Sequence, residues 1–235
     1  MSLYQNLAVS GLFRQEKRYD VIANNLSNAH TFGFKKDVPL FHKVLTDAVK
    51  FSLADDPVET RTLFMQGDLQ GTQGELDVAI EGEGFFKVMT PGGIRYTRNG
   101  SFHLNREGVL VQANGFPILS NGREMNLKGG RVIIDQDGSV SVDGSNQGKI
   151  DLVTFPDLKG LVKEGSTLYR LESEQDEIEG KQGKMRQGAL EISNVNALEE
   201  MIRMIDSLRS FESSHKVVQV EDDMNARAVN DLGKV

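Results

Sequence analysis

Acidic side chains beside glycine turns are the residues of this sequence best placed to do chemistry. Asp135–Ser139 begins like the calcium-binding loop of an EF-hand, which needs oxygen ligands at fixed positions and a glutamate at position 12. Counted from Asp135, position 12 is Asn146. Because the loop lacks this bidentate ligand, we interpret it as a hairpin turn between two strands.

A second acidic group surrounds the turn at Gly82–Gly84. Asp77, Glu81 and Glu83 could supply the two carboxylates of a glycoside-cleaving site, but nothing distinguishes an acid from a base among them. The turn leads into an apolar strand, whereas a nucleotide-binding glycine loop opens a helix. We therefore assign no catalytic residue and expect no enzyme; an enzyme acting on peptidoglycan is kept as an alternative.

Metal and cofactor sites also lack the residues they need. The chain has no cysteine, and no two of its histidines have metal-ligand spacing. These histidines are His30, His42, His103 and His215. We expect no metal, no cofactor and no small-molecule substrate.

Charge and hydropathy exclude two classes of partner. The net charge is -7 at pH 7 and no basic stripe is present, which argues against nucleic acid. The longest early apolar run, Leu7–Val9, is far shorter than the ~7–15 residues of a signal peptide core. No stretch approaches the ~20 apolar residues of a membrane span. We expect no membrane insertion and no cleaved signal peptide.

The N-terminal end of the chain has the pattern of an amphipathic helix. Residues 2–28 contain no proline and one glycine, and Ser2 is a suitable N-cap. Apolar residues recur at steps of three and four, with Gln15 filling one gap. They are Ala8, Leu12, Tyr19, Ile22 and Leu26. Asparagines and then Gly33 end the helix, and we expect Gly33 to need a positive φ.

The C-terminal end predicts a longer helix that begins near Ser193 or Asn194. One apolar frame comprises Ala197, Met201, Met204, Leu208, Phe211, His215 and Val218. A second set beside it comprises Val195, Leu198, Ile202 and Ile205. This stripe is wider than the seam of a two-stranded coiled coil, so the helix needs more than one neighbour. An acidic C-terminal end and a basic N-terminal end favour pairing of the two helices, weakly.

The middle of the chain has the two-residue period of β-strands. Turn residues at 90–93, 105–108 and 135–138 join strands into three hairpins, and further strands are expected at 149–155 and 167–171. The predicted fold class is α+β, with N- and C-terminal helices packed as a coiled-coil-like pair and an inserted all-β central domain. The predicted divisions are 1–36 for the N-terminal helix and signature turn, 37–74 for an extended arm, 75–171 for the β domain, 172–192 for a return arm and 193–235 for the C-terminal helix.

Four blocks of sequence, in this order, resemble the flagellar rod and hook family of axial proteins. They are Ala23–Lys35 (ANNLSNAHTFGFK), Leu76–Phe86 (LDVAIEGEGFF), Arg95–Phe102 (RYTRNGSF) and Gly188–Asn196 (GALEISNVN). The resemblance runs from near Leu3 to near Leu232. It implies paired terminal helices, axial self-assembly into a torque-transmitting periplasmic rod, and export without a cleaved signal by the flagellar type III apparatus. The implied partners are copies of this chain, other rod proteins and that export apparatus.

Within this family the chain looks more like the proximal-rod type. The run from Lys36 to Gly74 looks too short for the distal type, which usually has a tyrosine where Phe211 stands. A distal-rod or other hook-basal-body paralogue is one alternative, and a cell-wall glycan-binding module is an alternative of another class. The expected assembly interface consists of Leu12, Tyr19, Ile22, Asn25, Leu26, Gly33, Phe34, Val195, Leu198, Met201, Ile202, Ile205, Leu208 and Phe211.

Overall fold

The chain forms two compact units. The computed structural model describes residues 3–40, 59–172, 177–180 and 183–232. The helical unit comprises Met1–Ser27, Asp37–Arg61 and Asn196–Val235, and the β unit comprises Asn28–Lys36 and Thr62–Val195. The chain is therefore α+β, with the β unit formed mainly by the middle of the sequence.

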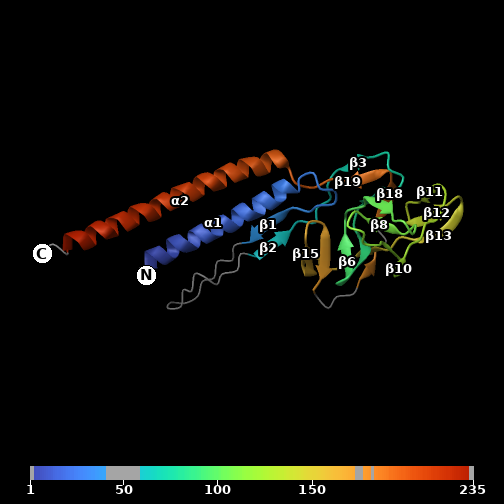
Figure 1. The fold of residues 1–235 in the computed structure, drawn as a ribbon, viewed down its shortest axis with the longest axis horizontal. Coiled ribbons are helices and arrows are strands. Elements are labelled where there is room, and N and C mark those ends of the chain that lie inside the picture. The colour runs from blue at the N-terminus through green and yellow to red at the C-terminus, as the bar shows by residue number, and fades with distance from the viewer. Residues whose placement is uncertain (1–2, 41–58, 173–176, 181–182, 233–235) are drawn as a thin grey trace. The chain divides into compact units, whose positions relative to one another are not determined.

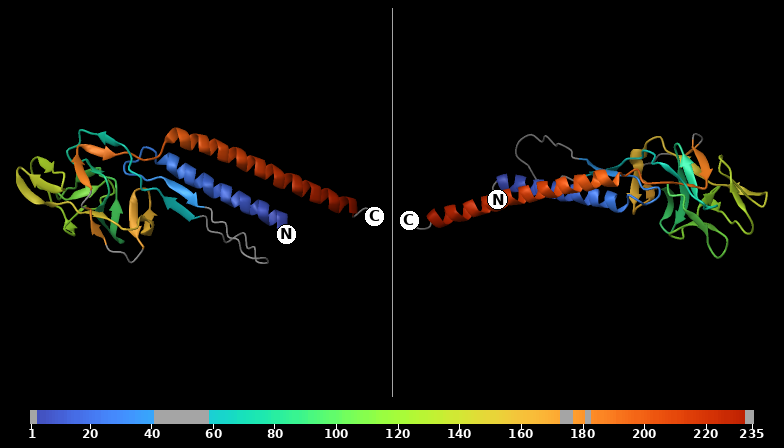
Figure 2. Two further views of the ribbon diagram at one scale, coloured as in Figure 1. Left: turned by 180° about the vertical axis from the view of Figure 1, so that it is seen from behind. Right: turned by 90° about the horizontal axis from the view of Figure 1, so that it is seen from above.

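The helical unit is built on two long helices. α1 (Leu3–Ser27) and α2 (Ala197–Leu232) lie side by side and antiparallel, so that both chain ends point the same way (Figures 1 and 2). A Cβ added at Gly11 of α1 would meet no atom within 4 Å, so packing does not require glycine at this position. Two short strands, β1 (Asp37–Leu40) and β2 (Glu59–Thr62), form a two-stranded sheet.

α2 begins later than its sequence predicts. Its N-cap is Asn196, whose Oδ1 accepts hydrogen bonds from the backbone N–H groups of Leu198 (3.1 Å) and Glu199 (3.2 Å). The prediction that the helix begins near Ser193 or Asn194 is therefore wrong. The side chain of Asn194 bonds instead to other backbone segments of the β unit, so it is not available as a cap. The predicted cap Ser2 of the first helix lies outside the described residues.

The largest sheet of the β unit is six-stranded and antiparallel, in the order β15-β16-β6-β5-β14-β17. Its strands are β5 (Phe85–Thr90), β6 (Gly93–Thr97), β14 (Leu152–Thr154), β15 (Leu161–Glu164), β16 (Leu168–Leu171) and β17 (Ile178–Glu179). A short 3-10 helix, Leu158–Gly160, precedes β15. Five aromatic rings pack edge to face or tilted beneath this sheet: Phe64, Phe85, Tyr96, Phe155 and Tyr169.

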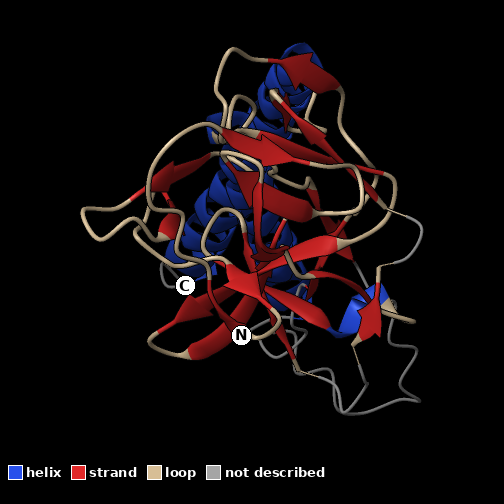
Figure 3. Cartoon of the chain, turned by 90° about the vertical axis from the view of Figure 1, so that its right-hand side faces the viewer, coloured by secondary structure: helices blue, strands red, loops and turns tan. Residues whose placement is uncertain are grey.

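Smaller sheets complete the β unit, whose strands are red in Figure 3. One has three strands, β11 (Val132–Ile134), β12 (Ser139–Val142) and β13 (Ser145–Lys149). The two-stranded sheets pair β3 (Leu69–Gly71) with β19 (Ala189–Glu191), β4 (Val78–Glu81) with β18 (Lys184–Gln187), β7 (Phe102–Leu104) with β8 (Leu110–Gln112), and β9 (Leu119–Ser120) with β10 (Arg123–Glu124). A core of buried aliphatic residues, including Val78, Ile80, Leu110, Ile118 and Ile150, joins them.

The three predicted hairpins are confirmed as β5–β6, β7–β8 and β11–β12. The calcium-like stretch is the turn of the third hairpin, as expected. The carboxylate of Asp137 there accepts hydrogen bonds from the backbone N–H (3.0 Å) and hydroxyl (2.8 Å) of Ser139, and these bonds lower its pKa. Residues 172–192, expected as a return arm, contain β17, β18 and β19 in their described part.

Candidate assembly interface

The face of α1 that pairs with α2 is the predicted stripe. Ile22 is buried and Tyr19 and Leu26 are half-buried, whereas Phe13 on another side is exposed. The side chain of Leu12 lies outside the described part of the chain. Gln15, the polar residue within the stripe, is half-buried. α1 therefore directs one continuous face of its described residues toward a partner.

Asn25, also expected at the interface, holds β1 against the end of α1. Its Nδ2 donates to the carbonyl of Asp37 (2.8 Å), and its Oδ1 accepts from the Asp37 N–H (2.9 Å). Both residues are buried. Since the amide is used on both sides, Asn25 fixes the path of the chain within the helical unit.

α2 presents a mixed line of residues toward α1, which we call the inner line. The inner line consists of Glu200, Met204, Ser207, Phe211, Ser214 and Val218, at alternating steps of four and three. Its two most buried members are polar, Glu200 and Ser207. Gln15 Nε2 donates to the backbone carbonyl (2.9 Å) and the hydroxyl (3.0 Å) of Ser207, which places this line against α1. The contact between the helices is thus partly polar.

The expected apolar residues of α2 lie mostly outside this contact, and we call them the outer row. They are Leu198 (68% exposed), Met201 (47%), Ile202 (54%), Ile205 (51%) and Leu208 (43%). Val217, Val220 and Met224 are also exposed, farther along the helix. Phe211 is 38% exposed and its ring lies 6.2 Å from that of His215. Several large apolar side chains exposed on one side of a helix are typical of an interaction site.

Gly33 lies at the turn that follows α1, in the β unit. Its φ is +70°, which confirms the expectation of a positive φ. A Cβ at this position would overlap the backbone of Arg98 and Asn99. The Gly33 N–H donates to the carbonyl of Glu191 (2.7 Å). Two independent constraints, the dihedral angle and the close approach, therefore require glycine here.

Substitution of Gly33 by alanine should destabilise the β unit strongly. The left-handed conformation costs a non-glycine residue about 1–3 kcal/mol, and the overlap with backbone adds to this cost. Gly115→Ala is the matched control, because Gly115 also has a positive φ (+79°) but a Cβ added there would meet no other atom within 4 Å. Chemical denaturation followed by circular dichroism should show a larger loss for Gly33→Ala. Equal losses would mean that the close approach to Asn99 is unimportant.

Phe34 is a core residue of the β unit. It is fully buried, and Lys163 Nζ lies 4.0 Å from its ring centroid. The same ammonium donates to the carbonyl of Lys35 (2.6 Å). Val195, the last residue of the β unit in the sequence, is also buried. In the described structure these two expected interface residues contribute to packing within the β unit.

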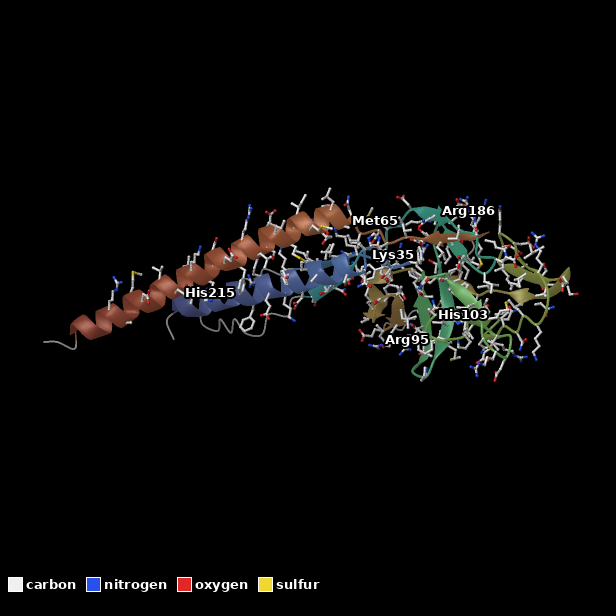
Figure 4. All side chains as sticks on the ribbon, turned by 45° about the horizontal axis from the view of Figure 1, so that its top comes forward. Lys35, Met65, Arg95, His103, Arg186 and His215 are labelled. Atoms are coloured by element: carbon white, nitrogen blue, oxygen red, sulfur yellow. The ribbon has the colours of Figure 1, made fainter. Side chains whose placement is uncertain are left out.

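A buried charged cluster lies next to Phe34, and the sequence patterns considered above did not predict it. Lys35 Nζ donates to Glu191 Oε1 and to the Met65 carbonyl (2.7 Å); Lys35 and Met65 are labelled in Figure 4. Arg98 Nη1 donates to Glu191 Oε2 (3.3 Å), and Gly67 N–H donates to Glu191 Oε1 (2.9 Å). The side chains of Lys35 and Glu191 are completely buried and that of Arg98 is nearly so.

The charges in this cluster do not balance. Two cations share one carboxylate, and Arg98 Nε has no hydrogen-bond partner among the described residues. Burial lowers the pKa of Lys35, and the attraction of Glu191 opposes this shift. Burial likewise lowers the pKa of Arg98. Glu191 is therefore the anion on which both buried cations depend.

Asn194 extends the cluster into a tie between three chain segments. Its Oδ1 accepts from Lys36 N–H (2.7 Å), and its Nδ2 donates to the carbonyls of Leu63 (2.9 Å) and Met65 (3.0 Å). Leu63 N–H in turn donates to the Lys36 carbonyl (2.8 Å). We call the residues Lys35, Lys36, Leu63, Met65, Gly67, Arg98, Glu191 and Asn194 the clasp. The clasp joins the segments by which the chain enters and leaves the β unit.

A signal for the cluster was present in the sequence. Lys35, Arg98 and Glu191 each lie inside one of the blocks that carry the family resemblance. Lys35 and Glu191 are ionisable residues next to aromatic or apolar residues, in Phe34-Lys35 and Leu190-Glu191-Ile192, whereas Arg98 lies between Thr97 and Asn99. A charge in an apolar setting needs a buried partner, so the sequence favours pairing of Lys35 with Glu191. Arg98 carries no such signal in its neighbours.

Among the acidic candidates, Asp77 has a contact that stabilises the local backbone. Asp77 Oδ2 accepts a hydrogen bond from the Thr72 hydroxyl (2.7 Å) and thereby stabilises a turn. Within the described residues, no group of three His, Asp or Glu side chains could hold a metal ion. No described helix is long and apolar enough to cross a membrane.

Comparison with protein families finds three matches along the chain. Residues 6–35 match the family described as "Flagella basal body rod protein". Residues 79–142 match "Flagellar hook protein FlgE/F/G D1 domain", and residues 186–232 match "Flagellar basal body rod FlgEFG protein C-terminal". Lys35, Arg98 and Glu191 thus come one from each matched segment.

Several curated proteins are similar over nearly the whole chain. The flagellar basal-body rod protein FlgF of Caulobacter vibrioides is 35% identical, over 98% of this chain and 99% of its own length. The flagellar basal-body rod protein FlgG of Borreliella burgdorferi is 35% identical, over 95% of this chain and 96% of its own length. The flagellar hook-basal body complex protein FlhO of Bacillus subtilis is 28% identical, over 97% of both chains.

Proposed function

Because the chain belongs to the family of flagellar basal-body rod proteins, we propose that it is a structural, non-enzymatic subunit of the proximal rod. In this role it assembles axially with copies of itself and with other rod proteins, and transmits torque across the periplasm. Export proceeds through the flagellar type III apparatus. The role needs no catalytic residue, cofactor or small-molecule substrate.

The observation that carries this proposal is the exposed outer row of α2. A helix that served only to pair with α1 would direct its most apolar side to α1. Here the inner line contains Glu200 and Ser207, while Ile202 and Ile205 face solvent. An apolar row left outside its own helix pair is suited to burial against another subunit.

We assign α1 of a second copy as the occupant of the outer row, in coiled-coil-like packing. Among the described side chains of α1, exposed Arg14, Lys17 and Arg18 outnumber exposed Glu16 and Asp20 by one charge, and Lys17 Nζ lies 3.7 Å from Asp20 Oδ2. Exposed acidic residues lie beside or within the outer row: Glu199, Asp206 and Glu212. Such complementarity favours one orientation of approach and becomes weaker at high salt. Because α1 and α2 are different surfaces, the contact is heterologous and can repeat along a shaft.

The proximal assignment rests on two features of the sequence. Residues 36–74 form a run that is short for a distal-rod protein, and Phe211 stands where the distal type usually has tyrosine. Relatives named FlgF and FlgG are equally similar in identity, so the percentage does not separate the two types.

Electron microscopy of purified basal bodies tests the proposal. A tag placed in the full-length chain, followed by gold labelling, should mark the rod on its proximal side. Label on the distal rod would replace the proximal assignment by the distal one. Basal bodies that lack the subunit, together with co-sedimentation of the soluble chain with peptidoglycan, would favour a glycan-binding module instead.

A further inference from the structure

The side of α2 that faces α1 is not its most apolar side. Ser207 is 2% exposed and Glu200 1%, whereas every member of the outer row is more than two-fifths exposed. Rotation of α2 about its axis would bring Ile202 and Ile205 toward α1 and bury more apolar surface, which is favourable by itself. Something must therefore oppose this rotation.

Gln15 is the residue placed to oppose it. It interrupts the apolar stripe of α1, between Leu12 and Tyr19, and its amide must find acceptors within the helix contact. Ser207 supplies two, a backbone carbonyl at 2.9 Å and a hydroxyl at 3.0 Å. Both are accessible only because Ser207 is small and faces α1.

In the rotated arrangement the same amide would lie against hydrocarbon. Aliphatic side chains such as Ile202 and Ile205 offer no side-chain acceptor, and their branched bulk keeps the amide away from the second lone pair of the helical carbonyls beside them, which a small serine leaves open. A buried amide that loses its partners costs more than the bond itself contributed. A single polar residue in a helix seam can specify one arrangement in this way.

We propose that Gln15, through Ser207, selects which face of α2 pairs with α1 and so keeps the outer row available outside the helix pair. The use of the outer row in assembly rests on the proposed function. The choice of the α2 face that pairs with α1 is a property of the single subunit and does not rest on it. Gln15 is thus a positioning residue that prevents a more apolar but assembly-incompetent pairing.

Thiol labelling of the full-length subunit tests this inference, because the chain has no cysteine of its own. Ser214→Cys reports on the half-buried inner line and Ile205→Cys on the outer row. With Gln15 present, the thiol at 205 should react faster than the thiol at 214. With Gln15→Leu, the thiol at 205 should become slower and that at 214 faster, each by about three- to tenfold, the size of one or two net hydrogen bonds.

Glu16→Leu is the matched control, since it adds the same leucine at the exposed position next to Gln15. It should leave both labelling rates unchanged. Unchanged rates in Gln15→Leu as well would overturn the inference. An increase at both positions would also overturn it, because Gln15 would then be needed for pairing and not for the choice of face.

The labelling result is independent of the proposed function. If Gln15→Leu reverses the labelling and the variant also fails to enter basal bodies, both proposals gain support. If the labelling reverses but assembly is normal, Gln15 selects the face while the outer row is not the assembly surface. Failure of labelling alone leaves the rod assignment intact.

Discussion

An Ile202→Asp subunit is expected to be folded and exported but absent from basal bodies. Ile202 is 54% exposed in the subunit, so a carboxylate there is solvated and costs the isolated protein little. Against a neighbour, the substitution removes about 1.5–3 kcal/mol of apolar burial and adds desolvation of an unpaired charge. In a repeating heterologous contact this loss recurs at every subunit, so assembly should fail completely.

Three measurements check this result: circular dichroism of the purified subunit, its recovery in isolated basal bodies, and swimming in soft agar. Ser210→Asp is the matched control. It adds the same carboxylate at an exposed position that follows Arg203 by two helical turns and lies away from Ile205 and Leu208 around the helix. Control cells should remain motile. Recovery of exported Ile202→Asp subunits in normal rods would exclude the outer row as the assembly surface.

The sequence predicts the helices well but not the contact between them. Apolar periodicity identifies positions that avoid water, and Tyr19, Ile22 and Leu26 do lie toward α2. It does not say which neighbour covers each position. For α2 the apolar frame and the face that contacts α1 share Met204, Phe211 and Val218 but otherwise differ, because Ser207 meets the amide of Gln15. A serine within a helix gives no signal of this kind until its partner is known.

In the β unit, too, features set by adjacent residues could be predicted, and features set by distant residues could not. The hairpins could be predicted because their turn residues are adjacent in sequence, and the positive φ of Gly33 follows from its place after a helix. The α2 N-cap could not, since the side chain of Asn194 is bonded to segments more than a hundred residues away. Local capping rules cannot weigh such a competing bond.

Substitution of Glu191 by glutamine should cause the largest loss of stability in the clasp. It leaves Lys35 and Arg98 buried without their anion, and breaking a buried ion pair from one side costs about 3–5 kcal/mol. Lys35→Met is a milder change, because Glu191 keeps Arg98 as its partner and the charges then balance. We expect it to cost about 1–3 kcal/mol, the range for a lost buried hydrogen bond.

Urea denaturation followed by circular dichroism measures both losses. Hydrogen exchange shows which part of the β unit is destabilised. In Glu191→Gln the amides of Gly33 and Gly67, which donate to the backbone carbonyl and the side chain of Glu191, should lose protection, while the β11–β12 hairpin keeps it. If Lys35→Met were as destabilising as Glu191→Gln, the shared anion would not be the centre of the cluster.

Raising the pH should restore part of the stability lost in Glu191→Gln. Burial lowers the pKa of Lys35 in the folded chain, and Glu191 limits that shift. Without Glu191 the folded pKa falls further, whereas in the unfolded chain it stays near its ordinary value of about 10.4. Between these two values the unfolded chain binds more protons, so the free energy of unfolding rises with pH.

The stability gap between Glu191→Gln and the unsubstituted protein should therefore be smaller at pH 9.5 than at pH 7, when measured by urea denaturation at constant ionic strength. The double variant Lys35→Met, Glu191→Gln has no lysine at position 35 to titrate, so its stability should not recover at pH 9.5. A gap that stayed constant with pH in the single variant would mean that Lys35 escapes to solvent when Glu191 is removed.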